Sequence, residues 1–277
     1  RPCHQINDGP LSTARQPACL RTSPWPSTSP LTNAAAHLSA RQKHRQHEPA
    51  MTEQEMTIDF QRTERLGFGE AVFCTDKSPR QINEILVAVQ NDGSPILMTR
   101  LSEAKFEALD AAHRDAIDYD PVSETGFFRF AQTPGRSGRV AVVTAGTSDA
   151  RIAREASRTL EFNGEEATLF FDVGVAGLWR LTSRLGEIKA HPIVIAVAGM
   201  DAALVSVLGG LIPGIMIGVP TSTGYGAARN GETALGASLS SCAPGVTICN
   251  IDNGYGAACA ALRALHSATL LAPSNAG

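Results

Sequence analysis

The chain of 277 residues has few aromatic residues and no strong excess of charge of either sign. Aromatic side chains make up 5% of the residues, and the formal net charge at pH 7 is −3. Proteins that bind nucleic acids commonly present a basic surface or aromatic rings on which bases stack. The composition therefore argues against a nucleic acid as a partner.

Cysteine and histidine are scarce, and neither has the spacing of a metal site. The six cysteines include no C-x-x-C pair, and four of the seven histidines fall within the first fifty residues. Cysteines without a disulfide or metal pattern are typical of a reduced compartment. We therefore predict a cytoplasmic protein with no dedicated metal site.

The first 55 residues lack the periodic apolar pattern of a folded segment. They are rich in Pro, Ser and Thr, and they contain no apolar core of the kind that a signal peptide needs. Such a composition cannot bury enough apolar surface to fold. We expect residues 1–55 to be disordered, and to be upstream sequence if the true start is Met51 or Met56.

An uninterrupted apolar run long enough for a membrane span is also missing. Residues 192–220 contain a single charged residue, Asp201, but Gly and Pro break the run repeatedly. A membrane-spanning helix needs about 20 consecutive apolar residues. Strands that are buried on both faces of a parallel sheet give similar apolar runs. We therefore expect strands here, and no membrane association.

Residues 56–135 alternate short elements typical of a small α/β domain. Residues 80–90 and 102–114 have the pattern of helices, with Ser102 as the expected N-cap of the second. Residues 94–100 and 127–131 have the pattern of strands. Residues 133–139 carry Pro, Gly and Ser, and they are interpreted as a linker.

Residues 136–277 repeat an apolar strand followed by a helical segment. The expected strands are 140–146, 167–174, 192–199, 215–222 and 246–251. Strands that alternate with helices form a parallel sheet covered on both faces. The prediction is a three-layer αβα domain with a five-stranded parallel sheet, similar to flavodoxin and Rossmann folds.

Small, polar and acidic residues follow every one of these strands. In such folds ligands bind beyond the carboxyl ends of the strands, so a ligand site is expected there. The stretch GTSD before a helix favours a phosphate or ribose, although Asp149 could simply cap that helix. Asp201 interrupts the longest apolar run; if partly buried, its pKa should be raised, which suits a proton-transfer group, but it could also be an N-cap.

Cys242 lies in a polar turn, between a helix and the fifth strand, whereas Cys249 lies in an apolar run and is expected to be inert. A helix C-terminus disfavours a thiolate, so a reactive Cys242 would need a positive charge nearby. A cationic ring in a substrate would provide that charge. The composition alone leaves a structural role for Cys242 open.

Several motifs together resemble the LarB family of nickel-pincer cofactor biosynthesis. They are TAGTSD, DVGVAGLW, AVAGMD, VPTSTGYGA, SSCAPGV and NIDNGYGA, and GFGEAVFCTDKSPRQI in the smaller domain. The catalytic half of that family is similar to aminoimidazole ribonucleotide (AIR) carboxylase. The resemblance covers roughly residues 64–265.

The resemblance implies a carboxylase that also hydrolyses a phosphoanhydride. Its substrates would be nicotinic acid adenine dinucleotide and CO₂ or bicarbonate, and its products pyridinium-3,5-biscarboxylic acid mononucleotide and AMP. The catalytic cysteine of the family matches Cys242, and we assign Asp201 as the base. The residues expected to bind the substrate are Thr147, Ser148, Asp149, Asp172, Ser222, Tyr225, Gly226, Asn250, Asp252 and Asn253.

Two positions depart from the usual family pattern. The family usually has Glu where this chain has Asp201, and His where it has Trp179. The family also implies a homo-oligomer, with an octamer among the forms of related carboxylases. No tightly bound cofactor is expected, and any Mg²⁺ would be held mainly by substrate oxygens.

Two other functions remain open at this point. One is AIR carboxylase or mutase activity in purine biosynthesis, although the histidine-bearing loop that this activity needs is not evident. The other is a nucleotide-binding regulator without catalysis, in which Cys242 is structural.

Overall fold

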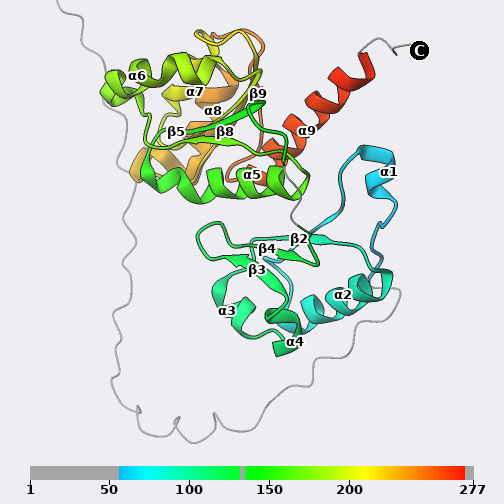
Figure 1. Ribbon diagram of the computed structural model, residues 1–277. Coiled ribbons are helices and arrows are strands. Elements are labelled where there is room, and N and C mark those ends of the chain that lie inside the picture. The colour runs from blue at the N-terminus through cyan, green and yellow to red at the C-terminus, as the bar shows by residue number, and fades with distance from the viewer. Residues whose placement is uncertain (1–55, 132–134, 272–277) are drawn as a thin grey trace, which may run out of the picture. The chain divides into compact units, whose positions relative to one another are not determined.

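The computed structural model describes residues 56–131 and 135–271. The predicted disorder of residues 1–55 therefore lies outside the described residues. Two β-sheets organise the described part of the chain (Figure 1). The boundaries proposed above for the two domains stay a prediction.

The smaller sheet is mixed and has the strand order β1-β2-β4-β3. Strand β1 (Ala71–Phe73) is parallel to β2 (Ile96–Thr99), whereas β4 (Thr125–Phe128) is antiparallel to β2 and to β3 (Ile117–Asp120). A short helix, α1 (Arg62–Leu66), precedes this sheet. The strands predicted near 94–100 and 127–131 are present, whereas β1 and β3 were not foreseen.

Helix α2 (Pro79–Asp92) confirms the helix predicted for residues 80–90. It begins with a capping box: Gln81 N–H donates to the Ser78 hydroxyl, and Ser78 N–H donates to the Gln81 side chain. Pro79 occupies the first turn, where a missing N–H has no cost.

The single helix predicted for residues 102–114 is wrong. The structure has two short helices instead, α3 (Glu103–Glu107) and α4 (Ala111–Arg114). The backbone of Asp110 leaves the helical region, with ψ of 137°. This break lets Leu109 pack into the core of the smaller domain. Ser102 stands at the N-cap of α3, but its side chain makes no capping hydrogen bond.

The larger sheet confirms the predicted five-stranded parallel fold. Its strands are β5 (Val140–Thr144), β6 (Thr168–Phe170), β7 (Ile193–Ala198), β8 (Ile215–Pro220) and β9 (Thr247–Ile248). Their spatial order is β6-β5-β7-β8-β9, and all neighbouring pairs are parallel. This is the flavodoxin-like order, whose switch point lies between the first and third strands, here β5 and β7.

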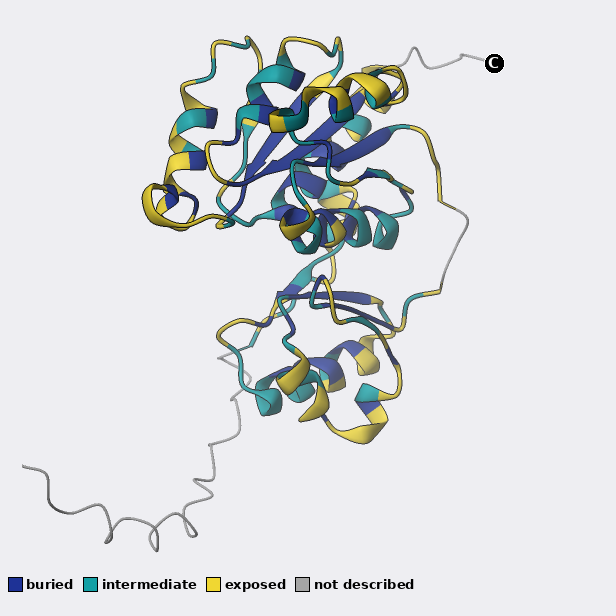
Figure 2. Ribbon diagram, turned by 90° about the vertical axis from the view of Figure 1, so that its left-hand side faces the viewer, coloured by how far each residue is buried: buried dark blue, intermediate teal, exposed yellow. Residues whose placement is uncertain are grey.

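Helices cover both faces of this sheet, which is buried between them (Figure 2). Helices α5 (Ala150–Phe162) and α9 (Gly254–Leu271) pack on one face. Helices α6 (Leu178–Lys189), α7 (Ala203–Gly209) and α8 (Glu232–Leu239) pack on the other. Short 3₁₀ turns precede three of them, at Thr147–Asp149, Val175–Gly177 and Gly226–Gly231.

The observed strands are shorter than predicted, most of all β6, which ends at Phe170 and not at Gly174. Strand β9 is only Thr247–Ile248, so Cys249 lies beyond it and is only partly buried. Helix α9 begins at Gly254, so Tyr255 and Gly256 belong to its first turn and not to the preceding loop.

The apolar residues 192–220 form β7, α7 and β8, as expected for a buried sheet. No helix in the described ranges is both long enough and apolar enough to cross a membrane.

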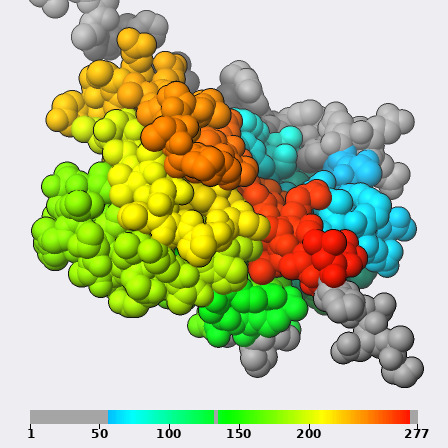
Figure 3. All heavy atoms as spheres, turned by 90° about the horizontal axis from the view of Figure 1, so that it is seen from above, coloured from blue at the N-terminus to red at the C-terminus, as the bar shows by residue number. Residues whose placement is uncertain are grey.

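The segment after α1 contributes to the core of the larger domain. Phe68 is buried among side chains of the sheet and of α9, including Leu262. The guanidinium of Arg263 lies 5.5 Å from the centre of the Phe68 ring. In Figure 3 helix α9 (red) accordingly lies beside blue and cyan residues of the smaller domain.

Candidate functional site

A cavity of about 510 Å³ lies at the carboxyl ends of β5, β6 and β7. This is the switch point of the sheet, where ligands bind in folds of this kind. The volume is within the range of small-molecule sites. Of the residues predicted from the sequence, those that line it are Thr147, Ser148, Asp149, Asp172 and Asp201.

Asp149 is the buried carboxylate of this cavity, with 2% of its surface exposed. Its Oδ1 accepts a hydrogen bond from the Thr221 hydroxyl at 2.7 Å, and its Oδ2 accepts one from Gly146 N–H at 2.9 Å. Burial raises the pKa of Asp149 because desolvation disfavours the charged form, and the nearby Asp252 acts in the same direction. The hydrogen bonds from Thr221, Gly146 and Thr223 act in the opposite direction.

Asp149 caps the 3₁₀ turn Thr147–Asp149 that leads into α5, because its Oδ2 accepts a hydrogen bond from Gly146 N–H, the backbone group just before that turn. Its side chain makes no capping hydrogen bond to α5 itself. It reaches back to Gly146 and across to the end of β8, so it holds two loops of the cavity together. The hydroxyl-bearing residues beside it, Thr147 and Ser148, are exposed in the cavity, where they are available to a ligand.

The side chain of Asp201 is exposed, so the condition of partial burial that the sequence left open is not met. It lines the cavity and accepts a hydrogen bond from Ala203 N–H at 3.3 Å, just before helix α7. Helix α7 begins two residues later, so Asp201 lies in the loop between β7 and α7. The carboxylate is thus accessible to a bound molecule.

The backbone is strained on both sides of Asp201. Met200 and Ala202 have φ of 56° and 50°, a left-handed conformation that non-glycine residues seldom adopt. Gly199 is tightly enclosed, because a Cβ there would lie 2.4 Å from the carbonyl oxygen of Thr223. Strain of this kind is concentrated at functional sites, where the surrounding structure holds it in place.

Asp172, which lines the cavity, forms a salt bridge with Arg180, which does not line it. Arg180 Nη1 lies 2.9 Å from Asp172 Oδ1, and both side chains are partly exposed. The Asp172 backbone N–H donates to the Thr144 hydroxyl at 3.0 Å, which anchors this loop to the end of β5. Sequence reasoning missed Arg180, because a helical arginine without a motif gives no signal of its own.

The remaining predicted residues do not line this cavity. Ser222 and Asp252 contact each other, since Ser222 N–H donates to Asp252 Oδ1 at 2.9 Å. Tyr225 is 82% exposed, and Gly226 follows it with φ of 55°.

Two asparagines near the fifth strand have local structural roles. The Asn253 side chain accepts a hydrogen bond from Gly256 N–H at 2.7 Å, which makes it the N-cap of α9. The Asn250 side chain is exposed and accepts one from Ile251 N–H at 2.9 Å. The structure therefore gives neither of them a place in the cavity.

Cys242 is exposed in the loop between α8 and β9, as predicted, but it is not among the residues that line the cavity. Its neighbour Ser241 is hydrogen-bonded to Ser206 of α7, with 2.8 Å between the hydroxyl oxygens. The start of the same helix, at Ala203 and Leu204, lines the cavity. The loop of Cys242 thus contacts the same helix whose first residues line the cavity.

Thr221 and Thr223 contribute more to the site than the predicted Ser222. Thr221 is 1% exposed and bonded to Asp149, and Thr223 lines the cavity. Alternate residues of an extended segment point to the same side. That alternation was the available signal, and it places Ser222 on the opposite side.

Metal-ligating side chains do not gather in the described part of the chain. Over residues 56–131 and 135–271 no group of three or more His, Cys, Asp or Glu residues is arranged to hold a metal ion. His191 is bonded to Thr168 at 2.8 Å and to the Glu187 carbonyl at 3.1 Å, so it has a structural role.

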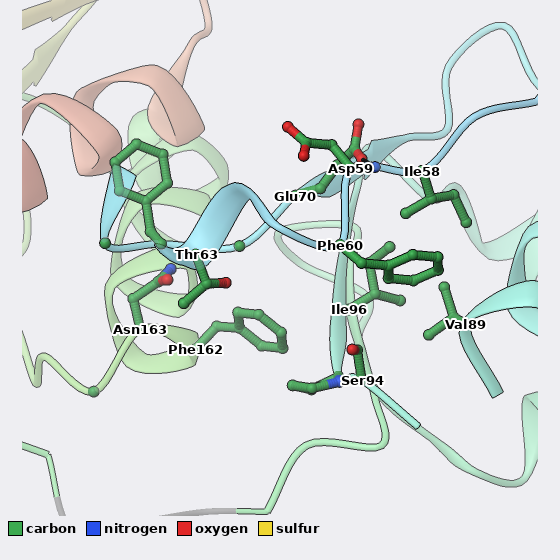
Figure 4. Close-up of a pocket in the computed structure, with 15 residues that line it drawn as sticks. Ile58, Asp59, Phe60, Thr63, Glu70, Val89, Ser94, Ile96, Phe162 and Asn163 are labelled. Atoms are coloured by element: carbon green, nitrogen blue, oxygen red, sulfur yellow. Dashed lines mark hydrogen bonds between the residues drawn. The ribbon is translucent and has the colours of Figure 1, made fainter. Parts of the chain in front are cut away.

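A second cavity, of about 350 Å³, was not foreseen from the sequence (Figure 4). Its walls include Phe60, Val89 and Phe162, with Asp59 and Glu70 at one side. Asp59 forms salt bridges with Arg62 and Arg65. None of the predicted site residues lines it, so the switch-point cavity remains the candidate site.

The fold and the position of the cavity define the class of protein. Residues 139–272 match the AIR carboxylase family, and residues 52–129 match the LarB/PurE-like N-terminal domain. The chain belongs to the LarB family, whose members are carboxylase-like enzymes. An uncharacterized protein of Methanocaldococcus jannaschii is 33% identical over 212 residues, which cover 74% of this chain and 82% of that protein.

Proposed function

We propose that the chain carboxylates the pyridinium ring of nicotinic acid adenine dinucleotide and cleaves its phosphoanhydride. The products are pyridinium-3,5-biscarboxylic acid mononucleotide and AMP. The observation that carries the proposal is the cavity at the switch point of a LarB-family chain. It combines accessible hydroxyls, a buried carboxylate and the exposed carboxylate of Asp201.

The ring needs activation before it can be carboxylated, because a pyridinium carbon is electron-poor and does not attack CO₂. The Cys242 thiolate adds to a ring carbon, and the ring nitrogen takes up the displaced electron pair. The ring becomes an enamine whose carbon 5 is nucleophilic. This is covalent catalysis, which divides one difficult step into easier ones.

Carbon 5 then forms a bond to CO₂, which leaves a new carboxylate and an iminium. Asp201 removes the proton from carbon 5, and the enamine forms again. The carbon–sulfur bond breaks with its electron pair returning to sulfur, so the ring is aromatic once more. Water cleaves the phosphoanhydride in a separate step, and no oxidant or reductant is consumed.

The exposure of Asp201 and Cys242 supports these roles, since both groups are accessible to a bound molecule. Thr147 and Ser148 at the start of the α5 segment suit the ribose and a phosphate. Mg²⁺ would be held mainly by the pyrophosphate oxygens of the substrate. Substrate binding would bring the ring between the cavity and the loop of Cys242.

We also propose that the chain works as a homo-oligomer. Large apolar side chains are exposed around the cavity and beside it, among them Leu178, Trp179 and Met200. Exposed apolar residues grouped in this way are typical of protein interfaces. Light scattering should give a mass that is a multiple of 29.2 kDa, and a mass of a single chain would contradict the proposal.

Mass spectrometry tests the reaction. The full chain is incubated with the dinucleotide, bicarbonate and Mg²⁺, beside Cys242→Ser and the control Cys259→Ser, which changes a partly buried cysteine of α9. The parent and the control should both form AMP and a mononucleotide heavier by one CO₂. Cys242→Ser should form no carboxylated product. AMP alone from the parent would contradict the carboxylation, and turnover of AIR instead would favour the purine reaction.

A further inference from the structure

One arginine of the smaller domain contacts the loop that leads into α9. Arg100 directly follows β2, and its Nη2 donates a hydrogen bond to the backbone carbonyl of Asp252. Its Nε lies 3.9 Å from Glu155 Oε1 on α5. The same guanidinium therefore faces two acceptors of the larger domain, which suits its planar fork of donors.

Asp252 uses all of its polar groups to hold neighbouring segments. Its N–H donates to the Pro220 carbonyl at 2.9 Å, and its Oδ1 accepts from Ser222 N–H at 2.9 Å. Its Oδ2 lies 3.9 Å from Arg151 Nη2. Asp252 thus links the end of β8 to the start of α9. The chain after β8 continues to Thr223, which lines the cavity.

Glu155 of α5 binds the backbone at the start of α9. It is 3% exposed, and its Oε2 accepts a hydrogen bond from Gly254 N–H at 3.0 Å. Helix α9 begins so close to α5 that a Cβ on Gly254 would lie 2.4 Å from the Ile152 carbonyl oxygen. Arg100 forms a salt bridge with this buried carboxylate, and Arg151 also acts on it from a greater distance, so Arg100 stabilises the acceptor that binds the first turn of α9.

Backbone strain is concentrated at the same place. Arg100, Glu124 and Asp252 have φ of 53°, 54° and 55°, in the left-handed region. Leu101 N–H donates to the Glu124 carbonyl at 2.8 Å, and Glu124 lies 3.7 Å from Arg151. Non-glycine residues keep such conformations only where the surrounding contacts hold them. These contacts come from both domains.

We propose that Arg100 is a positioning residue, through which the smaller domain holds the Asp252 turn and the β8 loop in the arrangement that the candidate site requires. The smaller domain is then part of the machinery that shapes the site. The effect on substrate rests on the proposed function, whereas the effect on the loop does not.

Hydrogen–deuterium exchange of the ligand-free full chain tests the positioning directly. The variants are Arg100→Gln, which removes the charge, and Arg100→Lys, which keeps the charge but loses the fork. The control is Arg114→Gln, which removes an arginine of α4 that pairs only within the smaller domain, with Glu107 and Asp115.

In Arg100→Gln the amides of Asp252 and Gly254 should exchange at least tenfold faster than in the parent, while β5 and β7 stay protected. Arg100→Lys should show a smaller increase, and Arg114→Gln none in this segment. Equal exchange in Arg100→Gln and Arg114→Gln would overturn the proposal. Circular dichroism shows whether Arg100→Gln folds. If it does not, the exchange rates of the Asp252 and Gly254 amides are compared between Arg100→Lys and Arg114→Gln, and equal rates would overturn the proposal.

Steady-state kinetics with nicotinic acid adenine dinucleotide test the consequence for the site. Arg100→Gln should raise the KM at least fivefold and change kcat less than twofold, and Arg100→Lys should recover part of the KM. Faster amide exchange in Arg100→Gln with an unchanged KM would show that Arg100 positions the Asp252 turn but does not affect substrate binding. If the parent itself does not turn over the dinucleotide, the proposed function fails, and the exchange result still decides the positioning.

Discussion

The Thr221 hydroxyl donates a hydrogen bond of 2.7 Å to the buried Oδ1 of Asp149, across the carboxyl edge of the parallel sheet. The two residues are 72 positions apart in the chain. The bond ties the loop after β8 to the loop after β5. It also satisfies a carboxylate oxygen that has little access to water, so the free energy of unfolding should depend on this bond.

Thr221→Val should destabilise the protein by about 1–3 kcal/mol, because it leaves the buried carboxylate oxygen without its donor and changes little in shape. Urea unfolding at pH 7 measures the free energy. Thr182→Val is the control, since the Thr182 hydroxyl is exposed and bonds only the Trp179 carbonyl. Equal unfolding midpoints for the two variants would show that the Thr221 bond adds no stability.

Asp149 should make the stability depend on pH. In the unfolded chain its carboxyl titrates near its ordinary pKa of 3.8, and burial raises that pKa in the folded protein. Between the two values the folded state holds more protons. The stability that Asp149 contributes is therefore present below pH 3.8 and is lost as the pH rises through the folded pKa.

Asp149→Asn removes this titration. The free energy of unfolding of the parent, relative to that of the variant, should fall as the pH rises from 3.8. Denaturant unfolding at a series of pH values measures the difference. Two parallel curves would mean that Asp149 does not titrate abnormally.

Alkylation should distinguish the cysteines by exposure. Cys242 is exposed, whereas Cys74 is fully buried, and burial raises the pKa of Cys74 to about 12. Among the four cysteines of residues 56–131 and 135–271, iodoacetamide should modify Cys242 first and Cys74 last, as peptide mass spectrometry would show. Nicotinic acid adenine dinucleotide should slow the modification of Cys242 at least fivefold. Unchanged labelling with saturating dinucleotide would place Cys242 away from the bound substrate.

Two substitutions of Asp201 test separately the charge and the length of its side chain. Asp201→Asn removes the proposed base and should lower carboxylation by about 10²–10⁴-fold, the usual contribution of a positioned acid or base. Asp201→Glu, which restores the usual family residue, should keep or increase the rate. Carboxylated product is measured at equal enzyme concentration. A rate for Asp201→Asn equal to that of the parent would exclude Asp201 as the base.

The helices and strands could be predicted where the local pattern decides the structure. Helix α2 has both its apolar periodicity and its capping box within its own sequence. The helix predicted for residues 102–114 failed because packing of Leu109 into a core built by distant strands favours a break. Strand β1 has only three residues, and β3 carries two aspartates, which are unfavourable in strands, so neither gave a strand signal.

The site could be predicted only in part. Strand ends mark the loops that meet at one edge of a parallel sheet, and this placed Asp149, Asp172 and Asp201 at one cavity. The burial of an individual carboxylate could not be predicted from the sequence. The sequence left open whether Asp201 is partly buried and whether Asp149 only caps a helix, and the structure exposes Asp201 and buries Asp149.

The sequence by itself determined the parallel αβα architecture and the edge where a site would form, because strand and helix periodicity and the residues after each strand are local properties. Only the tertiary structure decided that Asp149 meets Thr221 and that Arg100 reaches Asp252. Burial, pKa shifts and contacts between distant loops depend on what the rest of the chain places around a residue, and no local pattern carries that information.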